Sequence, residues 1–387
     1  MRRSIPFWRD VRVLRVFSQI LFVAIVALLA GFLYANLSQA MAKRGLTSGF
    51  GFLQLEAGFE IGETPIPYAP GDTYGRAYLV GVLNTLKVSL IGIVLATVVG
   101  LVAGVGRLSS NWLIRQITSA YIEVIRNTPL LVQLFFWYSA VIYQFPAIKS
   151  SIRLPGGIFL SKRGVALPWL RPTGTFRFWL LFLFGGIAAA IVLWVWRRRY
   201  QERSGKPGYA GFMSLGAVLV PSLAGWFLVG QRPLRPDVPE IQGFRFIGGT
   251  YMTPEYAALL IGLVVYTAAF IAEVVRGGII SVRKGQIEAG RSLGLTEMQS
   301  LRLIVFPQAL RIIVPPLTSQ YLNLAKNSSL AIAVGFPDLF NVSKTILNQT
   351  GRPVPVVILM MASYLTMSLL TSLLMNIYNR RIRFLET

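Results

Sequence analysis

The sequence contains no cysteine and no histidine, and only 14% of its residues are charged. Without cysteine, the chain can form no disulfide bond, no thiolate metal site and no cysteine nucleophile. Without histidine, it lacks the side chain that most often serves as general acid or base near neutral pH. We therefore expect no metal site and no catalytic residue in this chain.

Acidic residues are also scarce, since 15 Asp and Glu stand against 38 Lys and Arg, a net charge of +23. The basic residues gather before the first apolar run, near residue 200, around residues 276–311 and at the C-terminus. An even number of spans places these groups on one side, the cytoplasm by the positive-inside rule. The pattern predicts cytoplasmic termini and no nucleic-acid partner. The bias is not clean, because one opposite loop carries Lys149, Arg153, Lys162, Arg163 and Arg171.

Long apolar runs dominate the chain, and 54% of its residues are hydrophobic. A helix needs about 20 apolar residues to cross a bilayer. We therefore predict an all-α polytopic membrane protein with about eight transmembrane helices embedded in the lipid bilayer. The first apolar run is long and has no small-residue cleavage site, which favours a retained anchor over a signal peptide. The predicted spans cover residues 16–37, 79–106, 121–145, 176–196, 209–230, 254–275, 312–334 and 356–378.

Four regions follow from this division. We expect an N-terminal cytoplasmic segment with the first span and an external loop, two core spans, a two-span insertion, and a C-terminal core region. The insertion is rich in Leu, Phe, Trp and Gly, and we expect its spans to face lipid. The ranges are 1–78, 79–145, 146–253 and 254–387.

A polar segment, residues 285–307, lies between two spans and predicts two short helices. Gly294 suits a left-handed exit from the first helix. Thr296 is placed to cap the second helix, with Gln299 completing a capping box. Pro307 is predicted to end that helix. A helix–turn–helix indicates a rigid docking element, and an interfacial amphipathic helix is the alternative.

This segment resembles the ATPase-docking loop in the membrane subunits of bacterial ABC importers. That loop reads Glu-Ala-Ala, three residues, Gly, then nine residues and Ile-x-Leu-Pro. Gly290 replaces the second Ala and Phe306 replaces the Leu. By resemblance, the predicted ATPase-coupling residues are Glu288, Ala289, Gly290, Gly294, Ile304 and Pro307.

A second stretch, Arg126-Asn127-Thr128-Pro129-Leu130-Leu131-Val132-Gln133, resembles the Arg-Gly-Thr-Pro-Leu-Leu-Val-Gln motif of polar amino-acid ABC permeases. Pro129 breaks the helical hydrogen-bond ladder and frees backbone groups. Glu123 and Arg126 are three residues apart and are expected to pair. Their role, structural or in the pathway, stays open, and Gln133 is a pathway candidate.

Glu273 and Arg276 are also three residues apart, directly before the coupling segment. We expect Glu273 to pair with Arg276 or, across helices, with Arg126. A structural or gating ion pair is favoured over contact with substrate.

Lys326 lies within an expected span, in a stretch that resembles the family pattern Lys-x-Thr/Ser-Ser-Leu. A lysine at membrane depth costs about 3 kcal/mol by insertion scales, so it usually faces a cavity or a partner. It is a candidate contact for a substrate carboxylate, with snorkelling to the interface as the favoured alternative. The accompanying pathway candidates are Asn323, Asn327, Ser328 and, more weakly, Asn84.

The chain has no phosphate-binding Gly-x4-Gly-Lys-Ser/Thr loop, so ATP and Mg would bind to other subunits. The resemblance is to the polar amino-acid branch of ABC importer permeases, and within it to the larger permease of general L-amino-acid systems. It implies a type I importer core in the bacterial inner membrane, carrying polar, acidic or neutral L-amino acids. It also implies ATPase subunits, a sister permease and an external binding protein as partners. The alternative is a secondary amino-acid transporter that acts without an ATPase.

Overall fold

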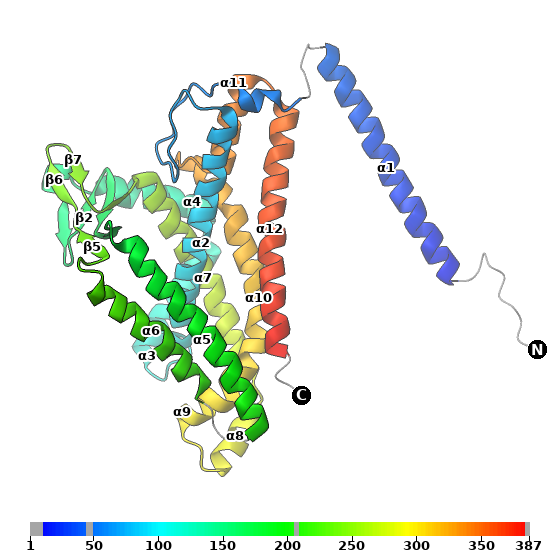
Figure 1. Ribbon diagram of the computed structural model, residues 1–387. Helices are drawn as coiled ribbons and strands as arrows, with labels where there is room; N and C mark the ends of the chain where they lie inside the picture. The colour runs from blue at the N-terminus through cyan, green and yellow to red at the C-terminus, as the bar shows by residue number, and fades with distance from the viewer. Residues whose placement is uncertain (1–10, 44–48, 205–208, 384–387) are drawn as a thin grey trace, which may run out of the picture. The chain divides into compact units, whose positions relative to one another are not determined.

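The computed structural model describes residues 11–43, 49–204 and 209–383. The two ends of the chain, which we expect to be cytoplasmic, lie outside these residues, as do residues 44–48 and 205–208. Seven helices of the described part are long and apolar enough to cross a membrane (Figure 1). They confirm seven of the eight expected spans and are α1 (Val11–Lys43), α2 (Tyr74–Gly106), α5 (Phe176–Ser204), α6 (Ala210–Leu228), α7 (Pro254–Ile280), α10 (Phe306–Asn327) and α12 (Pro353–Arg383).

The one expected span that is not among these seven, residues 121–145, is not one continuous helix. The chain forms α3 (Trp112–Asn127), then a break at Thr128-Pro129, then a short apolar stretch, Leu130–Gln144. Pro129 has no N–H to continue the hydrogen-bond ladder of α3, so the helix ends before it. The apolar stretch comprises α4 (Leu130–Phe135), the π-helical η3 (Phe136–Val141) and the 3₁₀ turn η4 (Ile142–Gln144).

The chain divides into two compact units, residues 1–134 with 259–387, and residues 135–258. In the first unit, the lower parts of α2, α7 and α10 share a buried apolar cluster that includes Ala96, Ile271 and Ile313. Helices α2 and α7 approach closely, because a Cβ on Gly100 would lie 2.7 Å from the Cβ of Ile271. Small residues permit this contact between membrane helices.

The other end of the first unit holds a separate cluster. The 3₁₀ turn η2 (Gly51–Gln54) and α11 (Leu339–Thr350) pack beside the start of α2, where Phe52, Tyr74 and Ile346 are buried together. Between α10 and α11 the chain forms the 3₁₀ segment η7 (Ser328–Ala333). The loop before α2 is therefore a packed part of the unit.

The second unit is a helical hairpin, α5–α6, with short strands that the sequence analysis left as loops. Three antiparallel sheets have the orders β1-β2-β3-β8, β4-β5 and β6-β7. The 3₁₀ turn η5 (Ile148–Ser150) precedes them. The strands are β1 (Ile152–Leu154), β2 (Ile158–Ser161), β3 (Gly164–Leu167), β4 (Trp169–Pro172), β5 (Leu234–Asp237), β6 (Glu240–Gln242), β7 (Arg245–Ile247) and β8 (Thr250–Met252).

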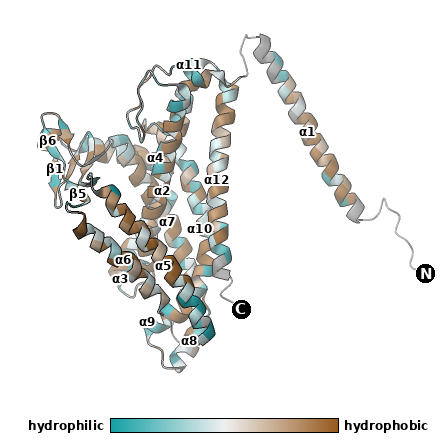
Figure 2. Cartoon of the chain, in the orientation of Figure 1, coloured by the Kyte–Doolittle hydropathy of each residue, from teal (hydrophilic) through white to brown (hydrophobic). Residues whose placement is uncertain are grey.

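Hydropathy separates the long helices from the segment between α7 and α10 (Figure 2). Apolar residues run along α2, α5, α6 and α12, and hydrophilic residues gather at the segment between α7 and α10 (Figure 2). The polar segment of the sequence, residues 285–307, thus forms helices of its own between these two spans.

Candidate functional site

The coupling segment, residues 285–307, folds as the sequence predicts at its first turn. Helix α8 (Lys284–Ser292) ends in a left-handed glycine, Gly294, with φ of 79°. The Leu295 N–H donates to the Gly290 carbonyl at 3.1 Å, and the Gly294 N–H donates to the Arg291 carbonyl at 2.9 Å. These are the two hydrogen bonds of a Schellman motif, which satisfies the last carbonyls of the helix.

The second helix, α9 (Glu297–Ser300), begins with the predicted capping box. The Gln299 N–H donates to Thr296 Oγ1 at 3.3 Å, and the Thr296 N–H donates to Gln299 Oε1 at 2.9 Å. The turn between α8 and α9 is therefore fixed on both sides by local hydrogen bonds.

The prediction that Pro307 ends this second helix is wrong. The chain runs from α9 through a π-helical segment, η6 (Leu301–Val305), directly into α10. Pro307 lies in the first turn of α10, where a residue without an N–H is tolerated. Helix α9 is thus continuous with α10, a helix long and apolar enough to span a membrane.

Gly290 has a packing reason at its position. It is buried, and a Cβ placed on it would lie 2.5 Å from Cδ1 of Ile304. Two of the predicted coupling residues, Gly290 and Ile304, therefore join α8 to η6. The others, Glu288, Ala289, Gly294 and Pro307, are exposed.

Large apolar side chains are exposed on the coupling segment, and Leu293 and Met298 are the most exposed of them. Leu293 is 82% exposed and Met298 is 71% exposed. Both flank the turn at Gly294. Exposed apolar groups on a rigid polar element are typical of a protein–protein contact.

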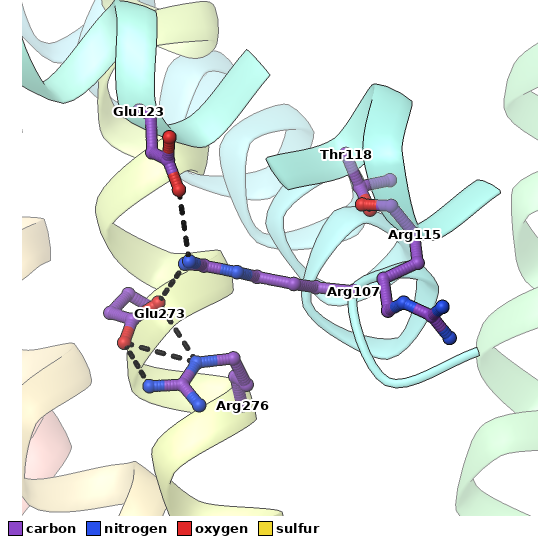
Figure 3. Close-up of polar contacts among 6 residues, drawn as sticks. All are labelled: Arg107, Arg115, Thr118, Glu123, Glu273 and Arg276. Atoms are coloured by element: carbon purple, nitrogen blue, oxygen red, sulfur yellow. Dashed lines mark hydrogen bonds and ion pairs between the residues drawn. The ribbon is translucent and has the colours of Figure 1, made fainter. Parts of the chain in front are cut away.

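An ionic cluster lies in the first unit, at the end of α7 that leads into the coupling segment. Arg107, the C-cap of α2, places Nη1 2.6 Å from Glu273 Oε2 and Nη2 3.4 Å from Glu123 Oε1. Arg276 holds the other side of the Glu273 carboxylate at 2.5 Å (Figure 3). One arginine therefore ties α2, α3 and α7 together.

The predicted Glu273–Arg276 pair is confirmed, and the predicted Glu123–Arg126 pair is wrong. Glu123 turns to Arg107, and Arg126 lies over the ring of Phe270, 5.2 Å from its centroid. The expected alternative pair, Glu273 with Arg126, is likewise absent from the ion pairs of the described residues. Spacing along one helix could not reveal Arg107, because its partners lie 16 and 166 residues away.

Gln133 donates hydrogen bonds to backbone carbonyls at the break before Pro129. Its side chain is buried, and Nε2 donates to the carbonyls of Ile125 at 2.9 Å and Thr128 at 3.0 Å. Ile125 is the residue whose carbonyl would have accepted from position 129 in an unbroken helix. The amide therefore has a structural use, and its pathway role stays a prediction.

The remaining pathway candidates fall into two groups. Asn323 and Lys326 are exposed on α10, Asn327 is half-buried, and Ser328 is buried with its hydroxyl donating to the Ala325 carbonyl at 2.8 Å. Asn84 is fully buried and donates to the carbonyls of Glu63 and Pro337 at 2.8 and 2.9 Å, so it fixes the loop before α2.

Residues 96–384 match the family of binding-protein-dependent transport system inner membrane components, and the chain belongs to this family. It is therefore a multi-pass inner-membrane permease subunit, and ATP hydrolysis is carried by separate subunits. The all-α polytopic fold is confirmed, with the short strands of the second unit as an addition.

Relatives match over nearly the whole chain. It is 46% identical to the putative amino-acid ABC transporter permease protein YhdX of Escherichia coli, covering 95% of this chain and 94% of the relative. It is 44% identical to the general L-amino acid transport system permease protein AapQ of Rhizobium johnstonii, covering 96% and 92%. A crystal structure of an amino acid ABC transporter with histidines aligns with 24% identity and a TM-score of 0.48, covering 80% of this chain and 95% of that one.

Proposed function

We propose that this permease serves an ATP-driven importer of polar L-amino acids, acidic and neutral ones included. The names of the relatives support this, since they include a general L-amino acid permease and a glutamate/glutamine/aspartate/asparagine permease, BztB of Rhodobacter capsulatus, 38% identical over 95% of this chain. A sister permease completes the pathway as a heterodimer, both termini lie in the cytoplasm, and the partner ATPases hold ATP and Mg. This chain binds no cofactor.

We infer that the coupling segment transmits the motion of the ATPases. The observation that supports this is the hydrogen-bonded turn at Gly294, which the exposed Leu293 and Met298 flank. Leu293 and Met298 seat in a groove of an ATPase subunit, where their burial stabilises the contact. Closure of the ATPases on ATP displaces α8 and α9 together, because the Schellman motif and the capping box fix their angle. The movement passes through η6 into α10.

The ionic cluster gives α7 a defined position during this movement. Glu273 lies seven residues before the end of α7, and Arg107 and Arg276 hold it from two sides. We infer a gating role in which α2, α3 and α7 move as one body against α10. Partly buried charge-assisted hydrogen bonds are strong enough for such a tie, at about 1.5–3 kcal/mol each.

Substrate contact is assigned to the polar face of α10. Asn323 and Lys326 are exposed there at the depth of an apolar span, where an ammonium group without a partner is unfavourable. The lysine ammonium pairs with the carboxylate that every amino acid carries, and the neighbouring amides of Asn323 and Asn327 supply hydrogen bonds.

Reconstitution of the purified importer tests the proposal. Proteoliposomes that contain both permeases and the ATPases should take up acidic and neutral amino acids only with internal ATP and with external binding protein. Basic and apolar amino acids in the same panel serve as comparison. Uptake by this chain alone, without an ATPase, would instead establish the secondary transporter.

A further inference from the structure

The second unit carries a folded layer of strands, which we name the basic β-layer, residues 146–175 and 231–253. Its strands come from both sides of the α5–α6 hairpin: β3 pairs with β8, and β4 pairs with β5. Figure 1 shows these strands gathered at one end of that hairpin. Pairing between the two sides makes the layer a defined surface rather than two separate loops.

The charge of this layer is strongly one-sided. It holds eight Lys and Arg against two acids, and all eight cationic side chains are exposed. One ion pair offsets them, between Arg171 Nε and Asp237 Oδ2 at 2.6 Å. Five of the cations have no partner among the described residues, namely Lys162, Arg163, Arg232, Arg235 and Arg245.

Two features of these cations are unfavourable, one for strand pairing and one for membrane topology. Arg171 of β4 lies directly opposite Arg235 of β5 in the ladder. Like charges at opposite positions destabilise a strand pair. The layer also lies at the hairpin end away from Arg197, Arg198 and Arg199, and basic residues in short external loops run against the positive-inside rule. Neither folding nor topology accounts for the charges.

Exposed apolar side chains lie among the cations. Phe244, at the β6–β7 turn, is 73% exposed, and Lys149 Nζ lies 4.3 Å from its ring centroid. Trp169 is 60% exposed. The rings of Phe159 and Phe246, 5.7 Å apart, join the β6–β7 hairpin to the larger sheet. Aromatic and arginine side chains together are the composition typical of protein interfaces.

We propose that the basic β-layer is a docking surface for an acidic face of the external binding protein. The inference rests on the proposed function, whose cytoplasmic termini place the basic β-layer on the external side of the membrane. The partner is inferred from the family, whose transport systems depend on a binding protein. The cations extend over three strand pairs, with Lys162 and Arg163 at the β2–β3 turn, Arg171 and Arg235 on β4–β5, and Arg245 on β6–β7. A single amino acid is too small to contact all three, whereas a protein surface spans them.

Binding-protein titration of the complete importer in nanodiscs tests this surface. The double variant Lys162→Glu/Arg163→Glu should raise the binding-protein concentration for half-maximal ATPase stimulation by about tenfold, with the rate at saturation unchanged. Glu240→Gln should lower that concentration. The swap Lys162→Arg/Arg163→Lys keeps the charge and should match wild type. The effect of the double variant should shrink as salt rises, because exposed charges are screened.

The outcomes separate this inference from the proposed function. If wild-type importer is stimulated by binding protein and the double variant has the same half-maximal concentration, the docking surface is refuted while the importer stands. A shift that depends on anionic lipid in the nanodisc would assign the cations to lipid headgroups and also refute it. If wild-type importer shows no stimulation by any binding protein, the proposed function itself fails.

Discussion

At the scale of single residues, Gly294 sets the angle between α8 and α9. Its φ of 79° is strained for a β-branched side chain, whereas asparagine tolerates the left-handed region. We expect Gly294→Val to reduce ATP-driven uptake and substrate-stimulated ATP hydrolysis together, and Gly294→Asn to retain most of both. Uptake and ATPase rates measured in proteoliposomes check this. Normal rates for Gly294→Val would count against a coupling role for this turn.

Asp338 is a second residue with a specific consequence, outside the membrane spans. It caps α11 by accepting from the Asn341 N–H at 2.9 Å, and burial raises the pKa of its carboxyl to about 6. The folded protein therefore keeps a proton that the unfolded chain releases near pH 4. This group's contribution to stability is full below pH 4 and is lost as the pH rises through about 6.

The substitution Asp338→Asn should keep the cap and remove this pH dependence. Between pH 4 and pH 7, wild-type stability should fall relative to the variant by on the order of 3 kcal/mol. Thermal unfolding of both proteins in detergent across this range checks the prediction. Parallel curves would show that the carboxyl titrates alike in the folded and unfolded chain.

The residues that could be predicted from the sequence are those whose partners are close along the chain. The left-handed Gly294, the capping box of Thr296 and Gln299, and the Glu273–Arg276 pair all satisfy local hydrogen-bonding groups within a few residues. Arg107 and the clamp by Asn84 could not be predicted, because their partners come from distant helices and loops. Local chemistry determines caps and turns, whereas packing determines which distant charges meet.

At the scale of helices, Arg107 joins α2 and α3 to α7. Arg107→Gln removes its two ion pairs and leaves Glu273 with Arg276 alone, which should destabilise the protein by about 1–3 kcal/mol. The solute transported per ATP hydrolysed should also fall. Arg115→Gln is the matched control, because Arg115 is exposed and points away from the cluster (Figure 3). Equal behaviour of the two variants in unfolding and transport assays would reject the tie.

The polar face of α10 gives another prediction at this scale. Lys326→Met should raise the solute concentration for half-maximal uptake about tenfold, the loss expected for one charge-assisted hydrogen bond. Lys344→Met, which removes an exposed lysine from α11, should leave uptake unchanged. Uptake measured against solute concentration tests this prediction. An unchanged half-maximal concentration for Lys326→Met would favour the alternative, in which the Lys326 side chain extends to the membrane interface.

The membrane helices could be predicted and the smaller elements could not. Runs of about 20 apolar residues have one stable form in lipid, so seven spans follow from length and hydropathy. The strands β1 to β8 are only three or four residues long, and two of their pairs, β3–β8 and β4–β5, join segments on opposite sides of the α5–α6 hairpin, which no local pattern displays. The break at Pro129 could be predicted from its missing N–H, whereas the two hydrogen bonds that Gln133 donates back across the break could not.

At the scale of the whole molecule, the chain combines an apolar membrane part with two polar regions of different kinds. The coupling segment is built between α7 and α10 and presents apolar side chains from a locked turn. The basic β-layer is built across the α5–α6 hairpin and presents cations. The coupling segment suits stable contact with an ATPase subunit. The basic β-layer suits reversible, charge-dependent contact with the binding protein.

Site-directed crosslinking tests the central claim most directly, that the coupling segment seats in an ATPase subunit. The chain has no cysteine, so single cysteines at Leu293 and Met298 are unique sites for a short photoactivatable or thiol-reactive linker. In native membranes, both positions should capture an ATPase subunit, and a cysteine at Phe244 in the basic β-layer should not. Failure of both coupling positions to capture an ATPase, in membranes where the variants still support uptake, would contradict the account.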